Sequence, residues 1–347
     1  MATLMFDGID DFVATTLDAY KRDVWTDISL EYQNYVSARL LREKKVEEVG
    51  GPQITWLVKT KNTGTAKITG LYAEDNTNVE DVMVQASVPW SMMTGNFSYD
   101  LREDIWQSTR ETIVRLLKIR LHAALCDVAV LREQKLWSAP TATTDKSPMG
   151  IPFWLQKDAT TTPGGAFNGA NPSGFTSGCG GVSSTTYPNW RNWAFGWSAA
   201  TQDDLVVKLK KAIVMTDFVS PVPHPEFGYG KSDYEIFTTY RVTEPLERLA
   251  ESRNDNLRQD LAKYMNQVTV GGVPMRFVPY LQENDTSDPL YGVNWKTFRP
   301  FVKRGWNMKR GEPQPAPKQH NVRNVHIDHA EQYICTNRRE NFVGSKA

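Results

Sequence analysis

The sequence lacks the marks of a disulfide framework, a secretory leader and a membrane span. Its 347 residues include three cysteines, Cys126, Cys179 and Cys335, an odd number at wide spacing without a CxxC pair, which argues against structural disulfides and a zinc knuckle. The N-terminal residues carry acids where a signal peptide carries bases, and no stretch approaches the ~20 apolar residues of a membrane-spanning helix. We therefore expect a protein that is made in the cytoplasm and has no membrane partner.

The chain also lacks an excess of charge of either sign. Lys plus Arg number 40 and Asp plus Glu number 40, so the formal net charge is zero. Such a chain has no overall positive field to recruit DNA, RNA or an anionic membrane, whereas a near-neutral balance favours association between copies. Nucleic-acid binding is therefore disfavoured as the main function.

Recognisable catalytic motifs are also absent. The sequence has no GxxxxGK[ST] loop, no GxGxxG between a strand and a helix, no GxSxG elbow and no HExxH among its five histidines. Consequently no catalytic residue, cofactor or metal ligand is predicted, and the chain is expected not to be an enzyme.

A metal-dependent or carbohydrate-active enzyme stays open as the weaker alternative because of two features. One is a set of residue types that suit zinc: His320, His326, Asp328 and His329. On an alternating strand, however, His326 and Asp328 fall on the polar face. The other feature is the eleven tryptophans, which could stack on carbohydrate, although their scatter along the chain favours core and subunit contacts.

The first recognisable structural pattern is an amphipathic N-terminal region. Hydrophobic residues make up 40% and charged residues 23% of the chain, which is ordinary for a folded protein of one or two domains. From residue 10 to residue 45 the apolar side chains recur at near-helical spacing. This spacing predicts a helical arm.

A long hairpin is predicted next. After the breaker GGP at residues 50 to 52 the apolar period changes to two, with Ile54, Trp56 and Val58 in alternation, and a second alternating run covers residues 82 to 88. The tip between them is polar (KNTGTAKITG, AEDNTN). Because such a projection cannot cover its own apolar faces, we expect it to lie on a neighbouring subunit.

The clearest predicted element is a long helix. Asp100 and Glu103 resemble a capping box that opens a helix without Gly or Pro to about Trp137, about 55 Å long at 1.5 Å per residue. Its apolar stripe comprises Ile113, Leu117, Leu121, Ala124, Leu125, Val128 and Leu131. Because the helix is about three times the average length, we expect it to span the subunit as a beam.

The remainder of the chain combines an irregular segment with an α+β region. Residues 138 to 200 are rich in Gly, Pro, Ser and Thr but also in Trp and Phe, which predicts an ordered loop region. Beyond it the patterns predict, in order, a helix at 201–215, a strand at 234–239, a helix opened by Thr243, Glu244 and Pro245 that ends near residue 265, a hairpin at 268–278 and a final strand at 322–335.

The order of these elements resembles the Hong Kong 97-like major capsid proteins of tailed bacteriophages over nearly the whole chain. Three segments resemble the axial part of those proteins: YEIFTTYRVTEPLERLAESRNDNLRQDLAKYMNQVTVGGVPMRFVPYL, DPLYGVNW and RGWNMKRGEP. The segment HAEQYICTNRRENFVG resembles their closing strand. The resemblance implies an α+β chain with the Hong Kong 97-like capsid fold.

The resemblance also implies a division of the chain. Residues 1–49 correspond to an N-terminal arm, 50–97 to the extended β-hairpin loop, 98–204 to a peripheral domain with the spine helix at 101–137 and the Gly/Trp-rich loop region, 205–308 to an axial α/β domain, and 309–347 to a return to the peripheral domain.

The function implied by the resemblance is structural. A chain of this family assembles with itself into the pentamers and hexamers of an icosahedral phage head that encloses double-stranded DNA without sequence-specific binding. The implied partners are scaffolding, portal and cement proteins, and the implied location is the virion capsid, assembled in the host cytoplasm. An encapsulin-like compartment shell, which holds a cargo enzyme, is the alternative with the same fold.

Within that fold the extended loop supplies the candidate assembly residues, which are Trp56, Lys59, Lys61 and Lys67. Some family members join a loop lysine to an asparagine near the C-terminus with the help of a glutamate. Asn337, Asn341 and Glu340 have the matching residue types. Because lysine and asparagine are common on solvated surfaces, crosslinking is not predicted here.

Arg338 and Arg339 lie at the end of the closing segment. Two adjacent arginines could touch enclosed DNA, but they are more often the solvated end of a strand. We expect the latter, with DNA confined loosely because the charge of the chain is balanced.

Overall fold

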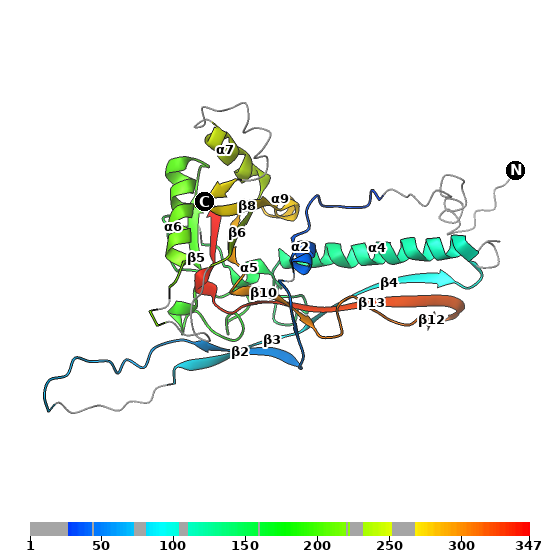
Figure 1. The fold of residues 1–347 in the computed structure, drawn as a ribbon, viewed down its shortest axis with the longest axis horizontal. Helices are drawn as coiled ribbons and strands as arrows, with labels where there is room; N and C mark the ends of the chain where they lie inside the picture. The colour runs from blue at the N-terminus through cyan, green and yellow to red at the C-terminus, as the bar shows by residue number, and fades with distance from the viewer. Residues whose placement is uncertain are drawn as a thin grey trace.

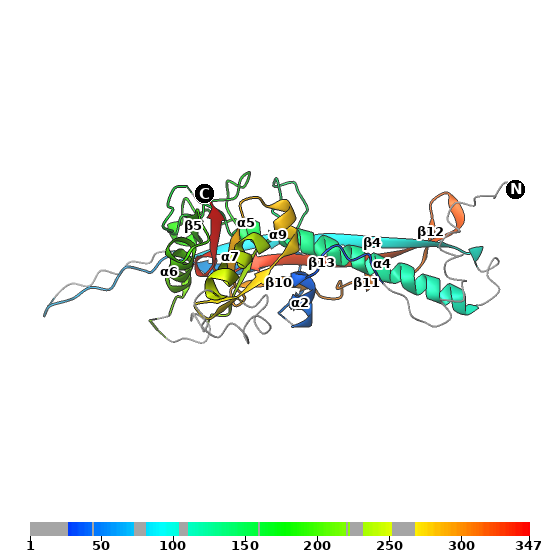
Figure 2. The same ribbon diagram turned by 90° about the horizontal axis from the view of Figure 1, so that it is seen from above.

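The computed structural model describes residues 27–43, 45–72, 81–103, 110–158, 160–219, 221–222, 232–251 and 268–347. These residues form two six-stranded sheets and a separate two-stranded hairpin. In Figure 1 the second sheet and its helices stand at the left, and the first sheet extends to the right together with a long helix. The view from above confirms an elongated molecule with the hairpin and the long helix at opposite ends (Figure 2).

The first sheet is built around β13 (Gln319–Cys335). Its other strands are β1 (Glu47–Val49), β10 (Phe298–Lys303), β11 (Lys309–Arg310), β12 (Gln314–Ala316) and β4 (Ser91–Asp100). β13 pairs antiparallel with β10, β11, β12 and β4, and β1 joins the edge parallel to β10. The strand predicted at 322–335 is confirmed and begins at Gln319, but it is not the final strand, because β14 (Phe342–Lys346) follows it.

Helix α4 (Arg110–Leu136) lies along β4 and β13 (Figure 1). Leu117, Leu121 and Leu125 on one side of the helix pack with Val325 and Ile327 of β13. These contacts confirm the predicted apolar stripe at those positions. Because the stripe recurs at helical spacing and the strand alternates, both elements present a continuous apolar face to each other.

The described part of α4 is shorter than the helix predicted at 101–137, and residues 104–109 lie outside the described residues. One half of the predicted capping box is present, because the Asp100 N–H donates to the Glu103 carboxylate at 3.3 Å. The Asp100 carboxylate itself accepts from the Arg102 N–H at 2.9 Å instead of from Glu103. None of the described helices, α4 included, is both long enough and apolar enough to cross a membrane.

The second sheet has the order β5 (Trp193–Trp197), β14 (Phe342–Lys346), β9 (Leu290–Asn294), β6 (Tyr234–Thr238), β8 (Val273–Phe277) and β7 (Thr269–Val270). β14 runs parallel to β5 and antiparallel to β9. The turn between β7 and β8 contains Gly271 and Gly272 with φ of 62° and 82°. Two positive φ angles in a row are what a tight hairpin turn requires, so the predicted hairpin is confirmed.

The two sheets do not follow the implied segments of the chain one by one, and the division into domains stays a prediction. β5 and β14, expected in the peripheral part, belong to the second sheet. β4, most of which falls within the expected loop 50–97, belongs to the first sheet through β13. The physical reason is that strand pairing is decided by partners far away in the sequence, which a local pattern does not identify.

Helices α6 (Val207–Thr216), α7 (Tyr240–Glu251) and α9 (Pro279–Asn284) surround the second sheet (Figure 1). A π-helical turn at Gln202–Val206 leads into α6. The Thr201 hydroxyl accepts from the Asp204 N–H at 3.3 Å, and this cap confirms the predicted start of the helix.

The start of α7 was predicted incorrectly. The helix begins at Tyr240 and not at Thr243, and Pro245 lies inside it. The Thr243 hydroxyl donates to the Thr239 carbonyl at 3.0 Å, so its side chain bonds one turn back and does not cap the helix. The predicted end near residue 265 lies outside the described residues.

The helical arm predicted at 10–45 is reduced to α2 (Val36–Arg42) in the described residues, and residues 1–26 lie outside them. Residues 27–35 are not helical. Ile28 and Leu30 are exposed there, whereas Tyr32 is buried with its ring against Tyr280. These apolar residues therefore do not share one helical face, although their spacing resembled one.

The segment 138–200 is ordered, as predicted. It includes α5 (Ile151–Trp154) and a 3-10 turn at Pro188–Trp190. Its four tryptophans, Trp154, Trp190, Trp193 and Trp197, are all buried. Trp154 and Trp190 belong to one hydrophobic core and Trp193 and Trp197 to another, and none of the four presents an exposed platform for carbohydrate.

Candidate assembly surfaces

The hairpin of β2 (Gln53–Lys59) and β3 (Met83–Pro89) is anchored at its base on the core of its own chain. Ile54, Ala86 and Val88 are buried, as the alternating pattern predicted. The two strands pair with each other and with no other strand among the described residues. The base of the hairpin is held by these side chains, by the Ser87 N–H bond to the Gly180 carbonyl at 3.0 Å and by the Gln332 amide bond to the Pro89 carbonyl at 2.9 Å, and not by strand pairing.

Trp56 belongs to this anchor. Its ring centroid lies 6.1 Å from that of Trp154, and Gly180 lies directly beneath it, since a Cβ added there would come 3.2 Å from the ring. Gly180 also has a φ of 65°, which favours glycine. Trp56 thus packs inside its own subunit. Its part in assembly stays a prediction, in which Trp56 orients the hairpin and does not itself contact a neighbour.

The tip of the hairpin has no such support. Residues 61–72 form no strand, and every one of them is exposed. The three predicted assembly lysines are exposed as well: Lys59, Lys61 and Lys67. Ile68, Leu71 and Tyr72 are 104%, 94% and 102% exposed. Apolar side chains gathered on a projecting tip mark an interaction site, so the structure brings the predicted lysines and three apolar side chains onto one candidate surface.

A second apolar surface lies on α6 and was missed by the sequence analysis. Val207, Val214 and Met215 on the helix are exposed, and so are Val219 and Val222 in the segment after it. The available signal was the spacing of seven residues between Val207 and Val214, which places both on one helical face. The opposite face of the helix packs on the second sheet.

Helix α2 is bonded to α4, and the residue just beyond it is bonded to the second sheet. The Ser37 N–H donates to one oxygen of the buried Glu133 carboxylate at 2.8 Å, and the Trp137 indole N–H donates to the other at 2.7 Å. Lys45, just beyond α2, forms an ion pair with Asp233 at 3.1 Å. These bonds join the segment to α4 and to the second sheet.

The zinc-like set of the sequence is not brought together. His326 is exposed, whereas His329 is buried and lies 2.7 Å from the Glu331 carboxylate. His329 Nδ1 accepts from the Met308 N–H at 3.3 Å, so both of its ring nitrogens have partners. Glu331 in turn forms a buried ion pair with Arg132 of α4. This cluster ties α4 to β13.

One group of three metal-ligand types does lie together among the described residues: Asp27, His122 and Cys126. The His122 Nε2 atom is 3.2 Å from the Asp27 carboxylate and 3.4 Å from the Cys126 sulfur. Burial and the nearby carboxylates of Asp27 and Asp127 raise the pKa of the thiol. The group offers three ligand atoms, and the His122 side chain is exposed, so no metal is assigned to it.

Arg338 is not a solvated strand end. It is fully buried and donates to the backbone carbonyls of Trp154, Trp190 and Ala170. Arg339 stacks over Phe167 at 4.6 Å from the ring centroid. Arg338 therefore holds the loop region together and is out of reach of DNA.

The residues considered for crosslinking lie at a buried junction. Glu340 and Asn341 are buried, and Glu340 accepts from the side-chain amides of Asn337 at 2.8 Å and Asn294 at 3.0 Å. Burial raises the pKa of Glu340 to about 7, against the effect of the Asn337 hydrogen bond. The Asn341 side-chain oxygen accepts from the Asn294 N–H at 2.8 Å, and its amide donates to the Asn337 carbonyl at 2.9 Å. These groups have partners within the subunit, and the loop lysines lie on the distant hairpin.

No protein-family model and no curated protein matches the chain. Solved structures do match it over almost its whole length. The capsid asymmetric unit of cyanophage A-1(L) aligns with a TM-score of 0.60 at 14% identity, covering 94% of this chain and 98% of the other. The capsid of a native GTA particle and that of Myoviridae phage XM1 each align with a TM-score of 0.51, at 11% and 9% identity. Both alignments cover 94% of this chain. They cover 95% of the GTA capsid chain and 98% of the phage XM1 capsid chain.

Proposed function

We propose that this chain, which has the Hong Kong 97-like fold of tailed-phage major capsid proteins, is itself a major capsid protein that assembles into a closed shell. The observation that carries the proposal is the hairpin tip, whose apolar side chains Ile68, Leu71 and Tyr72 project beyond the core of their own chain. Covering exposed apolar surface of this kind with another molecule removes it from water and is therefore favourable. In a shell, that molecule is the next copy of the chain.

A closed shell needs at least two kinds of contact, because one head-to-tail contact alone gives a ring or a filament. The hairpin supplies a head-to-tail contact, in which the surface of one copy meets a different surface of its neighbour. The exposed valines of α6, Val207 and Val214, supply a second surface on the second sheet. We assign that surface to contacts around the symmetry axes of pentamers and hexamers.

The stiffness of the subunit supports this assignment. α4 packs along β13, and the buried Arg132 and Glu331 pair joins the two elements. A helix and strand packed in this way hold the hairpin and the second sheet at a constant separation. Repeated copies can then meet at the same angles, which a closed shell of defined size requires.

The enclosed material proposed here is double-stranded DNA, held without sequence-specific contacts. The zero net charge and the buried Arg338 support loose confinement, since tight binding requires accessible positive charge. The proposed location is the virion capsid, assembled in the host cytoplasm. Scaffolding, portal and cement proteins are proposed as partners.

Electron microscopy of the purified protein tests the shell directly. We expect closed particles with pentameric and hexameric units, and a protein that stays monomeric at high concentration would contradict the proposal. Particles from the native source should contain DNA. Particles that contain a cargo enzyme and no DNA would support a compartment shell in place of a phage head.

Deletion of residues 60 to 78 tests the hairpin. We expect the shortened chain to fold, because the anchor residues Ile54 and Val88 remain, but to form no normal shells. The matched control replaces Thr63 and Thr65 with serine, which keeps the length, the lysines and the apolar side chains. Normal shells from the deleted chain would show that the hairpin has no part in assembly.

A further inference from the structure

The segment that runs from the end of β10 through β11 is basic. Residues 303–310, with the sequence KRGWNMKR, contain Lys303, Arg304, Lys309 and Arg310 and no acidic residue. β11 is an edge strand of the first sheet. The formal net charge of the whole chain is zero, so this excess of positive charge is local. We call residues 303–310 the basic loop.

The cations of the basic loop are available to an outside partner. Three of the four are exposed, and Lys303 is half-buried. Lys309 lies opposite Asp328 in the pairing of β11 with β13, yet none of the four forms an ion pair within the part of the chain that the structure describes. By contrast, Arg299 on β10 is paired with Glu47. No bonded acid therefore neutralises the loop.

The basic loop is held in one shape by its backbone. The Trp306 N–H donates to the Lys303 carbonyl at 2.9 Å, and the Trp306 carbonyl accepts from the Ala330 N–H of β13 at 2.9 Å. Gly305 between them has a φ of 77°, which favours glycine. The Lys309 ammonium lies 4.8 Å from the centroid of the Trp306 ring, and this contact orders one cationic arm. Less entropy is therefore lost when the loop binds a partner.

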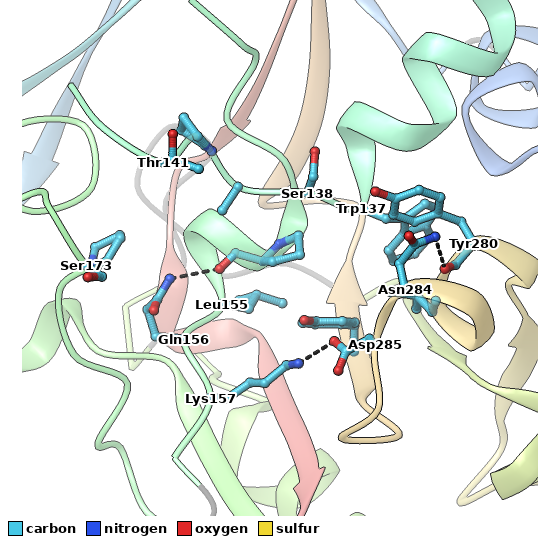
Figure 3. Close-up of a pocket in the computed structure, with 16 residues that line it drawn as sticks. Trp137, Ser138, Thr141, Leu155, Gln156, Lys157, Ser173, Tyr280, Asn284 and Asp285 are labelled. Carbon is cyan, nitrogen blue, oxygen red and sulfur yellow. Dashed lines mark hydrogen bonds and ion pairs between the residues drawn. The ribbon is translucent and has the colours of Figure 1, made fainter. Parts of the chain in front are cut away.

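The pocket at the end of α4 has no comparable charge. Lys157 and Asp285 are the only charged residues that line it, and they pair with each other (Figure 3). An anionic partner would therefore find unpaired cations on the basic loop and not in this pocket.

The ligand that suits such a loop is an extended molecule with repeated negative charge. Duplex DNA carries one negative charge per about 1.7 Å of its axis. The core of a protein interface is apolar, but the loop offers a protein partner little apolar surface. Trp306 is half-buried and already in contact with Lys309, and Met308 packs against the core under α4. DNA phosphates match the loop better than an acidic protein does.

We propose that the basic loop binds the phosphate backbone of double-stranded DNA through Lys303, Arg304, Lys309 and Arg310. The contact reads no base sequence, because phosphates carry none. The inference rests on the proposed shell function and names the part of the subunit that touches the enclosed DNA. Four phosphate contacts give a modest affinity that falls steeply with salt, in keeping with DNA that is confined loosely.

The salt dependence of duplex binding measures this contact. Full-length unassembled subunit is titrated into a fluorescent DNA duplex of about 20 base pairs at about 50 to 200 mM salt. With four phosphate contacts, the logarithm of the binding constant should fall against the logarithm of the salt concentration with a slope of about −3.6, which is about 150-fold over this range. A duplex of unrelated sequence should bind within about twofold.

Neutral variants locate the contact. Lys309→Gln combined with Arg310→Gln removes two of the four charges and should bring the slope to about −1.8. The matched control combines Lys118→Gln on α4 with Lys210→Gln on α6, which are also exposed, and should keep the slope of the wild type. All four side chains lie on the surface, so thermal melting should be unchanged in both variants. A slope that the loop variant leaves unchanged, or that the control lowers equally, would overturn the proposal.

The outcomes separate the loop from the shell. A subunit that forms shells but binds no duplex at low salt overturns the basic loop and leaves the shell function standing. A subunit that binds the duplex as expected but forms no shells fails the proposed function instead. Binding of polyglutamate without binding of the duplex would assign the loop to an acidic protein and would also overturn the DNA contact.

DNA-filled particles give a second readout. Ultraviolet irradiation of intact particles joins DNA to the side chains that touch it, and mass spectrometry after digestion identifies the peptides that carry nucleotides. We expect nucleotide adducts on the peptide that contains residues 303–310. Adducts found only on other peptides would contradict the contact, even if the isolated subunit binds the duplex.

Discussion

Arg39 of α2 and Glu235 of β6 form a two-pronged ion pair, with 2.8 Å between Nη1 and Oε1 and 2.6 Å between Nη2 and Oε2. Glu235 also accepts from the Trp295 indole at 2.7 Å and from Arg276 at 3.2 Å. Burial alone would raise the pKa of Glu235, but the hydrogen bond and charge of Arg39 outweigh it and lower the pKa to about 2. This pair is the main polar connection between the arm segment and the second sheet.

Replacing Arg39 with alanine should lower the free energy of unfolding. The Glu235 carboxylate would stay buried but would keep its bonds to Trp295 and Arg276. The free energy of unfolding should therefore fall by about 2 kcal/mol, less than the 3–5 kcal/mol expected when a buried charge loses its ion-pair partner. Urea denaturation of the unassembled subunit measures it. Glu43→Ala is the control, because Glu43 touches Arg39 only at 3.6 Å on an exposed face and should change stability by less than about 0.5 kcal/mol. Equal losses in both variants would contradict the assigned role.

Stability should depend on pH in two opposite ways. Glu235 and Glu331 have pKa values lowered from 4.5, in both cases because an arginine partner outweighs burial. Their contribution is therefore complete above about pH 4.5 and is lost as the pH falls toward 2. Glu340 has a pKa raised to about 7 by burial. The folded state keeps this proton while the unfolded state releases it, so stability falls as the pH rises from about 4.5 to 7.

Urea denaturation between pH 3 and pH 8 measures both trends. Glu340→Gln cannot titrate and should remove the decline between pH 4.5 and pH 7 while leaving the acid limb unchanged. The variant therefore isolates the contribution of Glu340. A decline of the same size in the variant would show that Glu340 is not its source.

Gly95 of β4 should not tolerate a side chain. A Cβ there would lie 2.8 Å from a methyl carbon of Val128 and 3.3 Å from the Ala124 carbonyl oxygen, so Gly95→Ala should push α4 away from the sheet. We expect a loss of about 1–3 kcal/mol, the range for overpacking. Adding Val128→Ala should cost less in this variant than in the wild type, because the two positions are in contact. Thr94→Ala, at an exposed neighbour, is the control.

Thiol reactivity should distinguish the three cysteines. Cys179 and Cys335 are fully buried, and burial raises the pKa of Cys179 to about 11 despite the charge of Arg338, and raises that of Cys335 as well. Since the thiolate is the reactive form, a disulfide reagent at pH 8 should label at most one thiol in the native protein, that of Cys126, and three in denaturant. Cys126→Ser should leave no reactive thiol before unfolding. Two reactive thiols in the native wild type would contradict the buried positions.

Several elements could be predicted because their signals are local. The alternation around Ile54 and Val88, the stripe that includes Leu117 and Leu121, and the Gly271 turn each reflect a period or a dihedral preference of adjacent residues. Pro245 misled the prediction of a helix start because proline is typical of the first turn. The end of the preceding strand, and not the proline, decides where that helix begins.

The sequence by itself determined that the chain folds, that it carries a hairpin its own core cannot cover, and which residues form the long helix and the closing strand. Only the tertiary structure decided that Trp56 packs inward, that Arg338 is buried among carbonyls up to 184 residues away, that Phe342–Lys346 joins the second sheet, and that the ring of Tyr291 is fully buried. The reason is physical. Periodicity is a property of neighbouring residues, whereas burial and pairing depend on contacts between residues that are distant in the chain.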